Sequence, residues 1–169
     1  VLTEGPTHSP VTLQLNLHIS TLVGDGVASY GGDGLPASSV SLNYPGGMWL
    51  DTAETYLYIA ETQSHVVRRV ELSTKIITTF AGTGIVPMGC FGNTLGHLYV
   101  SEKNAHVVRV IAPTGSNIID TYVGTGVAGT TANGVARTSA TLKYPRLIHV
   151  DAAGNLFIAG WGDYSIRKV

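Results

Sequence analysis

The chain has 169 residues, about the length of one domain; hydrophobic residues make up 44% of it and charged residues only 12%. Its formal net charge of -1 gives no electrostatic reason to expect a nucleic acid or an anionic membrane as a partner, and no apolar run approaches the roughly 20 residues that cross a bilayer. The single cysteine, Cys90, excludes an internal disulfide and the usual cysteine-rich metal sites.

Residues 1–10 form a lead that is rich in Pro, Ser and Thr. This composition fits a flexible tail. It also fits an O-glycosylated stalk in which Thr3, Thr7 and Ser9 are the acceptors. Ten residues are too few to separate the two interpretations.

Residues 11–24 are predicted to contain a strand, because apolar and polar side chains alternate along them. Five apolar residues share one face of this strand: Val11, Leu13, Leu15, Leu17 and Ile19. Such alternation is typical of a strand that is buried on one side only.

The rest of the chain divides into three copies of one repeat: residues 25–82, 83–124 and 125–169. The outer copies are related by an offset of 100 residues, at which Val23–Ala28 matches Val123–Ala128 without a gap. The middle copy is recognised by Glu61 and His65–Arg68, which recur 41 residues later. It is short, because it lacks most of the Gly-rich loop that precedes a proline in the outer copies.

Each copy contains four short runs rich in Val, Ile, Tyr and Phe, separated by Gly, Asn, Asp and Pro. The first run follows a proline at the same repeat position: Pro45, Pro87 and Pro145. Asp51 and Asp151 follow this run and are expected to cap a hairpin turn by accepting hydrogen bonds from their own backbone. Four short strands per copy predict an all-β fold made of antiparallel β-propeller blades.

The repeat resembles the NHL repeat. The shared pattern is Gly24, Gly26, Gly32–Gly34, Pro36–Ala37, Leu42–Pro45, Asp51, Leu57–Thr62 and His65–Arg68. The resemblance covers residues 19–169 and implies three NHL-type blades, a partial or open propeller. The third copy departs from the pattern, with Tyr164 where the histidine falls and Gly160–Gly162 where an acidic residue falls.

The two ends of the chain are out of register with the blades. The chain begins with a segment at the fourth-strand position, residues 11–24, and ends at Val169 after a third strand. Three blades cannot close a ring, since propellers take roughly 4 to 8. Three arrangements stay open: a piece of a longer propeller, two chains paired in a six-bladed ring, or strand donation from chain to chain in a filament.

The histidines favour a structural interpretation. His65 and His106 share one repeat position, where a role in joining a neighbouring turn is expected, such as donating a hydrogen bond to it. His149 is different, since Trp49 and Phe91 hold the matching places, and these three residues could line a central channel. Resemblance to NHL-like lyases would imply three histidine ligands for zinc; one is present, so no metal or cofactor is expected.

Few residues support nucleophilic catalysis, calcium binding or RNA binding. No Gly-x-Ser-x-Gly elbow is present, and Cys90 is expected to be a small buried residue. Asp25 and Asp33 are too few for calcium. Basic residues on the third run are expected on a solvated outer strand and not in an RNA-binding face: Arg68, Arg69, Arg109, Arg167 and Lys168.

The sequence therefore predicts a non-catalytic structural or interaction module, extracellular or at the cell surface, that assembles with itself or with other proteins. Two alternatives remain: a ligand-binding or sensor propeller that uses the mouth of the channel, and, less favoured, an NHL-type lyase or hydrolase.

Overall fold

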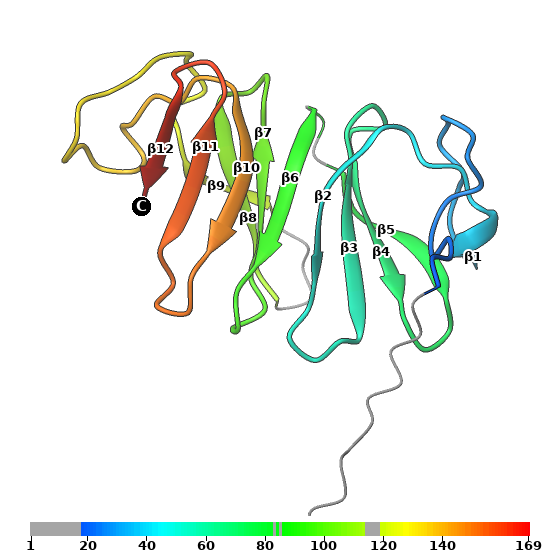
Figure 1. Ribbon diagram of the computed structural model, residues 1–169. Helices are drawn as coiled ribbons and strands as arrows, with labels where there is room; N and C mark the ends of the chain where they lie inside the picture. Colours follow the sequence, from blue (N-terminus) through cyan, green and yellow to red (C-terminus); the bar gives the residue numbers. More distant parts are fainter. Residues whose placement is uncertain (1–17, 83, 85, 114–118) are drawn as a thin grey trace, which may run out of the picture.

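The structure is a computed structural model that describes residues 18–82, 84, 86–113 and 119–169. Apart from one three-residue turn of 3-10 helix, η1 (Ala37–Ser39), its regular elements are β-strands. They form three antiparallel sheets, each one a blade, that succeed one another along the chain (Figure 1). This confirms the expected all-β fold of propeller blades. The predicted acceptors Thr3, Thr7 and Ser9 lie outside the described residues.

The first blade is a sheet of four antiparallel strands with a short fifth strand on its outer edge. In spatial order from the inside its strands are β2 (Pro45–Leu50), β3 (Tyr56–Glu61), β4 (Val66–Glu71), β5 (Ile76–Gly82) and β1 (Leu35–Pro36). The two-residue β1 belongs to the Gly-rich loop, which folds back over the outer edge of the blade and pairs with β5.

The second blade has four strands: β6 (Pro87–Gly92), β7 (Leu98–Glu102), β8 (Val107–Ile111) and β9 (Ile119–Val123). β6 starts five residues after the end of β5, so this blade is entered by a short connection, as the missing loop predicts. In all three blades the first strand begins at its proline, and the register shifts by a bulge within the next three residues.

The third blade has three strands in the described part of the chain: β10 (Pro145–Val150), β11 (Leu156–Gly160) and β12 (Ser165–Lys168). Its outer strand β12 pairs with β11 and with no other described strand. The outer edge of the third blade is therefore open among the described strands.

The predicted N-terminal strand differs from what is observed. Most of its apolar face lies outside the described residues: Val11, Leu13, Leu15 and Leu17. Residues 18–23 are described and form no strand, and Ile19 is fully exposed. The physical reason is that a β-strand needs a neighbour to satisfy its backbone, and the open edge of the third blade lies at the other end of the chain's arc of blades, out of reach of this segment.

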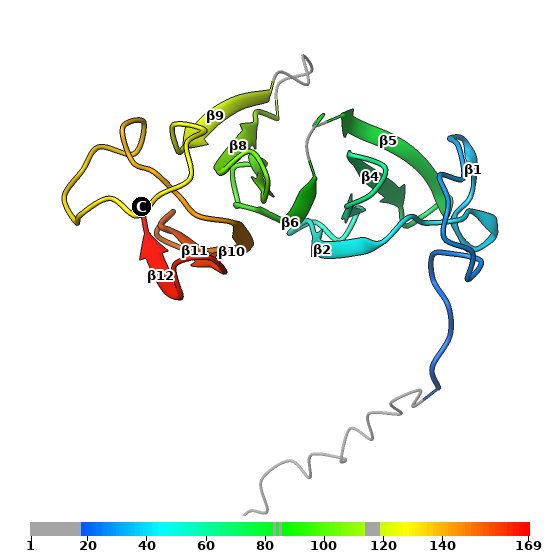
Figure 2. The ribbon, with the colours of Figure 1, turned by 90° about the horizontal axis from the view of Figure 1, so that it is seen from above.

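Seen from above, the blades form an arc in which β2, β6 and β10 succeed one another (Figure 2). Glycines let these first strands approach closely. A Cβ on Gly47 would lie 2.7 Å from Gly89 Cα, and one on Gly89 would lie 2.7 Å from the carbonyl oxygen of Arg146. Hydrophobic clusters fill the two spaces between blades, and a third covers the free side of the first blade.

Candidate interaction site at the two open blade faces

The three residues expected to line a channel form a row that runs from blade to blade. The ring centroids of Trp49 and Phe91 are 6.5 Å apart, and those of Phe91 and His149 are 4.4 Å apart. Trp49 also stacks on Tyr58. Each ring thus packs toward the next blade, and His149, the last in the row, is exposed on a side where no further described blade lies.

A buried ion pair links the strands of the first blade. Glu61 and Arg68 are both fully buried, and Arg68 Nη1 donates to Glu61 Oε2 at 3.1 Å. Arg68 also donates to the carbonyl oxygen of Gly32 and to Asp33 Oδ1, the latter at 3.0 Å. The Gly-Asp-Gly segment of the loop is therefore held by the ion pair, which gives Asp33 a structural role.

The second blade repeats this pair with Glu102 and Arg109. Arg109 Nε donates to Glu102 Oε2 at 3.0 Å, and its Nη1 donates to the hydroxyl of Thr121 on the fourth strand at 2.6 Å. Burial raises the pKa of Glu102, although the hydrogen bond and charge of Arg109 act in the opposite direction.

The third blade replaces the pair. Gly160 stands where the glutamate falls, and a Cβ there would lie 1.8 Å from Oδ1 of Asp163. The Asp163 carboxylate therefore occupies the space of the missing glutamate side chain. Asp163 Oδ1 and Ser165 Oγ are enclosed but have no hydrogen-bond partner among the described residues, while Arg167 donates to the carbonyl oxygen of Thr131 at 3.0 Å.

Sequence reasoning missed the ion pairs. It placed Arg68 on a solvated outer strand, which is wrong, since Arg68 is fully buried. The signal was present: Glu61 and Arg68 are seven residues apart, and so are Glu102 and Arg109. An acid and a base that recur together on adjacent strands of successive repeats indicate a buried pair, because unpaired charges are rarely buried.

The repeated histidines join each blade to the next. His65 Nδ1 accepts a hydrogen bond from the backbone N–H of Val86 at 3.0 Å, and His106 Nδ1 accepts one from Tyr144 at 3.3 Å. Val86 and Tyr144 each precede the proline that begins the next blade. In both of these bonds the ring nitrogen Nδ1 is the acceptor. Tyr164 holds this position in the third blade and is 93% exposed.

Asp51 and Asp151 lie in the first hairpin turn of their blades. Asp51 Oδ1 accepts hydrogen bonds from the backbone of Thr55 and Tyr56, at 2.6 and 3.0 Å. Asp151 Oδ1 accepts a hydrogen bond from the backbone N–H of Asn155, and the side-chain amide of Asn155 donates to Asp151 Oδ2. These bonds, first of all the one from the Asn155 side chain, hold the pKa of Asp151 below its usual value.

The carboxylates considered for calcium are engaged within the protein. Asp25 accepts from the backbone of Val27 at 2.9 Å and from the hydroxyl of Ser41 at 2.8 Å, and these bonds lower its pKa. Across the described ranges, no three His, Cys, Asp or Glu side chains lie together as metal ligands would. Cys90 is buried, and burial raises the pKa of its thiol to about 12.

The free face of the first blade exposes apolar side chains that the same repeat buries elsewhere. Met48 is 68% exposed, whereas Ile148 at the same position of the third blade is 9% exposed. Leu50 is 42% exposed, whereas its equivalent Val150 is 6% exposed. Ile148 and Val150 are covered by the second blade, as members of the cluster between the two blades. No described blade covers Met48 and Leu50.

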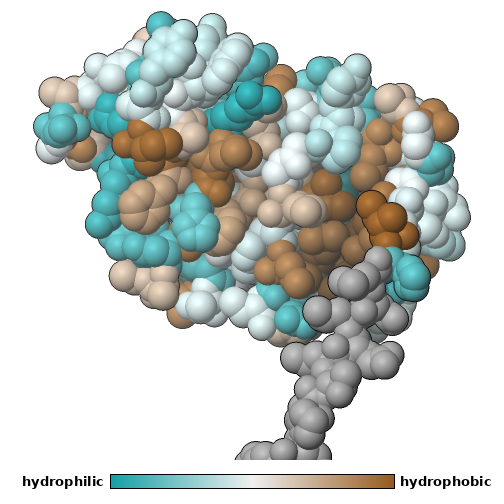
Figure 3. All heavy atoms as spheres, in the orientation of Figure 1, coloured by the Kyte–Doolittle hydropathy of each residue, from teal (hydrophilic) through white to brown (hydrophobic). Residues whose placement is uncertain are grey.

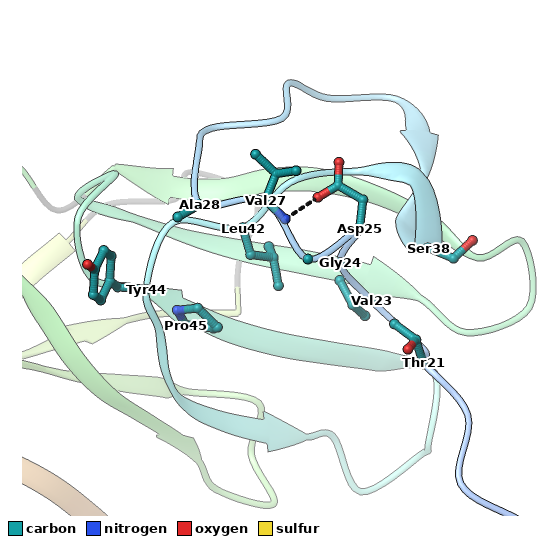
Figure 4. Close-up of a pocket in the computed structure, with 11 residues that line it drawn as sticks. Thr21, Val23, Gly24, Asp25, Val27, Ala28, Ser38, Leu42, Tyr44 and Pro45 are labelled. Atoms are coloured by element: carbon teal, nitrogen blue, oxygen red, sulfur yellow. Dashed lines mark hydrogen bonds between the residues drawn. The ribbon is translucent and has the colours of Figure 1, made fainter.

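A cavity of about 750 Å³ lies beside this face (Figure 4). It is lined by the start of the Gly-rich loop and by the residues that lead into β2, among them Val23, Val27, Leu42 and Tyr44. Figure 4 shows the side chain of Leu42 between the loop and the sheet. The lining is contributed by repeat positions that face the preceding blade, so the cavity marks the place that a neighbouring blade would take.

The free face of the third blade also exposes apolar side chains that the other blades bury. Ile166 is 70% exposed, whereas Val67 and Val108 at the same position are fully buried. Further exposed apolar side chains surround it and line a second cavity of about 260 Å³: Leu147, Trp161 and Tyr164. Apolar surface is visible on the third blade and on the first blade in Figure 3.

The described residues contain no helix that is long and apolar enough to span a membrane. No protein-family model matches the chain.

Among curated proteins, the chain is similar to NHL repeat-containing protein 2 of Bos taurus, with 31% identity over 86 residues, and of Homo sapiens, with 30% identity over 89 residues. These matches cover 41% and 43% of the chain. The chain spans 12% of the length of each relative.

Solved structures share the fold. A structural genomics protein of Bacteroides thetaiotaomicron superposes with a TM-score of 0.62 and 23% identity, over 73% of this chain and 32% of the other. A chain of a nidogen/laminin complex gives 0.58 and 16%, over 76% and 44%. An auxiliary nutrient binding protein of Bacteroides ovatus gives 0.61 and 20%, over 77% and 37%. The chain thus corresponds to less than half of each of these propellers.

Proposed function

Since the chain belongs to the NHL-repeat family of β-propellers, we propose that it is a non-catalytic interaction module that assembles with a second copy of itself through its two open blade faces. The first blade of one copy packs on the third blade of another, as the third blade packs on the second within one chain. Such a head-to-tail contact is heterologous, so it builds either a closed ring or a filament.

The contrast between equivalent residues carries this proposal. Ile166 is 70% exposed at a position that is fully buried in the other two blades, and Met48 is 68% exposed at a position that is 9% exposed in the third. Clustered exposed apolar side chains mark interaction surfaces in soluble proteins. Both faces are built from one repeat. The face of the first blade carries the apolar positions that pack against a preceding blade, and the face of the third blade carries those that pack against a following blade.

One comparison further supports an interaction role. One of the similar propellers was solved as part of a nidogen/laminin complex, which is an assembly between proteins.

Sedimentation velocity of the purified chain tests self-assembly. We expect particles heavier than the 17.7 kDa monomer whose size grows with concentration. Ile166→Lys places a charge in the contact without touching the monomer core, and should give monomers. Leu95→Lys is the matched control, because Leu95 is 74% exposed in a hairpin turn of the second blade. A wild-type chain that stays monomeric at all concentrations contradicts self-assembly.

The alternative is a ligand-binding propeller, and the cavity of about 750 Å³ is the observation that favours it. In that case the wild-type chain would be a monomer, and a small molecule could enter the cavity without displacing a second copy.

Metal analysis of the purified chain tests the enzyme alternative, since stoichiometric zinc or calcium would contradict the non-catalytic proposal. Extracellular or cell-surface localisation is part of the proposal, and immunolabelling of unpermeabilised cells tests it.

A further inference from the structure

We propose that residues 19–23 of a second copy add to the outer edge of β12 as the fourth strand of the third blade, in one defined register. This inference rests on the proposed self-assembly and specifies its contact. The register pairs Val23 with Ile166, Thr21 with Arg167, Ser20 with Lys168, and Ile19 with Val169. The occupant of the open edge is therefore a second copy of this chain.

The sequence of the segment is that of a fourth strand. Ile19, Thr21 and Val23 stand before Gly24 as Ile119, Thr121 and Val123 stand before Gly124. The first blade uses the same pattern in Ile77, Thr79 and Ala81 before Gly82. Both of these matching segments are observed as the fourth strands of their blades, β9 and β5.

The two complete blades share one register between their third and fourth strands. In the second blade Val108 pairs with Val123 and, after a bulge, Arg109 pairs with Thr121. In the first blade Val67 pairs with Ala81 and, after the same bulge, Arg68 pairs with Thr79. Ile166 and Arg167 hold these two positions in β12, which fixes where Val23 and Thr21 must fall.

A polar contact accompanies this register. Arg109 donates to the hydroxyl of Thr121, and in the first blade Asp33 Oδ1 accepts from both Arg68 and the hydroxyl of Thr79. The arginine of the third strand is thus tied to the threonine of the fourth. The described part of the third blade offers Arg167 no such threonine, and Thr21 supplies it in the proposed contact.

The backbone after the segment is already set for this pairing. Gly24 donates its N–H to the carbonyl oxygen of Ala37 at 2.9 Å, just as Gly124 donates to that of Arg137 at 3.1 Å. The φ angles of the two glycines are 101° and 107°. Val23 packs against the cluster on the free side of the first blade, and Val123 lies in the cluster between the second and third blades. A third blade docked on the first would therefore bring β12 beside residues 19–23.

Pairing within one chain is excluded by the arrangement of the blades. The segment lies at one end of the arc and β12 at the other, with the second blade between them (Figures 1 and 2). Ile19 is fully exposed, whereas Ile77 at the same position of β5 is fully buried. The segment thus has an apolar face to bury and no edge within reach, among the described strands of its own chain, to bury it on.

Disulfide trapping between two single-cysteine variants tests the register. Lys168→Cys and Ser20→Cys chains are mixed under mild oxidation; the equivalent pair in the second blade is Val110 and Asp120. Directly opposed residues are about 4.5–5.5 Å apart between Cα atoms, which suits a disulfide. We expect a covalent dimer in the mixture and none from either variant alone. The native Cys90 is buried and does not interfere.

Leu22→Cys mixed with Lys168→Cys is the control. Leu22 lies two residues further along, about 7 Å from Ser20, so that its cysteine is too far to bridge in the proposed register. A dimer with Leu22→Cys in place of Ser20→Cys overturns the register. If the chains self-associate but neither mixture gives a covalent dimer, the register is also overturned, while the proposed function stands. If the unmodified chain does not self-associate, both the register and the proposed function are overturned.

The threonine contact is tested separately by the affinity of self-association. Thr21→Val removes the hydroxyl and is expected to weaken association about tenfold, because one hydrogen bond to a charged group is lost. Thr21→Ser keeps the hydroxyl and should associate as the wild-type chain does. Equal affinities for the Val and Ser variants would overturn the role of Thr21 as the partner of Arg167.

Discussion

Val108 and Ile166 hold the same position in the third strand of successive blades, yet Val108 is fully buried and Ile166 is 70% exposed. The difference does not come from the inner part of the blade, because the second and third strands pair in the same register in both. It comes from the neighbours of this position, since Val108 packs against residues of the third blade and its strand pairs with β9, whereas Ile166 has no described blade on its face and β12 has no described strand beside it. The exposure of Ile166 thus reflects both the open face and the open outer edge of the third blade.

The ion pairs of the first two blades should differ in their contribution to stability. Arg68→Ala leaves the fully buried Glu61 without its partner and should lower the free energy of unfolding by about 3–5 kcal/mol. Arg109→Ala should cost about 1–3 kcal/mol, because the Arg109 side chain is 29% exposed and water can replace part of the contact. Urea unfolding of the two variants measures both. A larger loss for Arg109→Ala would show that the burial of the first pair does not decide its importance.

Packing between the first two blades depends on the absence of a side chain at Gly92. A Cβ there would lie 2.4 Å from the ring of Trp49, so Gly92→Ala should displace the indole and cost about 1–3 kcal/mol. Gly82→Ala is the matched control, since its Cβ meets nothing within 4 Å.

Tryptophan fluorescence in a Trp161→Phe background reports on Trp49 alone, because the chain has two tryptophans. We expect a red shift for Gly92→Ala and none for Gly82→Ala. The same spectrum in both variants would mean that Trp49 does not occupy the interface between the blades.

The hairpin carboxylate of Asp151 should make stability depend on pH. Its pKa is lower in the folded chain than the usual 3.8, chiefly because the Asn155 side chain donates to it. A lowered pKa stabilises the fold at pH values above the unfolded pKa, and this contribution is lost as the pH falls through the folded pKa. Asp151→Asn should therefore be less stable than the wild-type chain at pH 7, with a difference that narrows below about pH 4. Thermal unfolding at several pH values measures it; a constant difference down to about pH 2 would refute this role for the carboxylate.

The repeat pattern was sufficient to predict the strands and their order. Pro45, Pro87 and Pro145 begin the first strand of each blade, and the short spacing before Pro87 correctly places the lost loop between β5 and β6. These features depend on local rules: proline and glycine interrupt strands, and β-branched residues extend them. A sequence with three copies also allows each strand to be checked against its equivalents.

Burial of polar residues was harder to foresee. Arg68 is a charged residue on a strand and was therefore expected to face solvent. Its ion pair with Glu61 explains why it is buried. Ile19 is a different case, because it was expected on a strand that completes a blade of its own or of a neighbouring chain, and it is fully exposed in the single chain. Both depend on neighbours that are distant in sequence or that no described strand supplies, and periodicity carries no information about them.

Hydrogen exchange at the open edge tests the central claim most directly. Amide exchange in peptides that contain β12 and residues 18–24 is measured by mass spectrometry at high and low protein concentration. We expect exchange in both peptides to slow together as concentration rises, and to stay fast in Ile166→Lys, because the strand of a second copy would protect both sides of the contact. Fast exchange in β12 at every concentration would contradict the account, since the edge of the third blade would then have no partner.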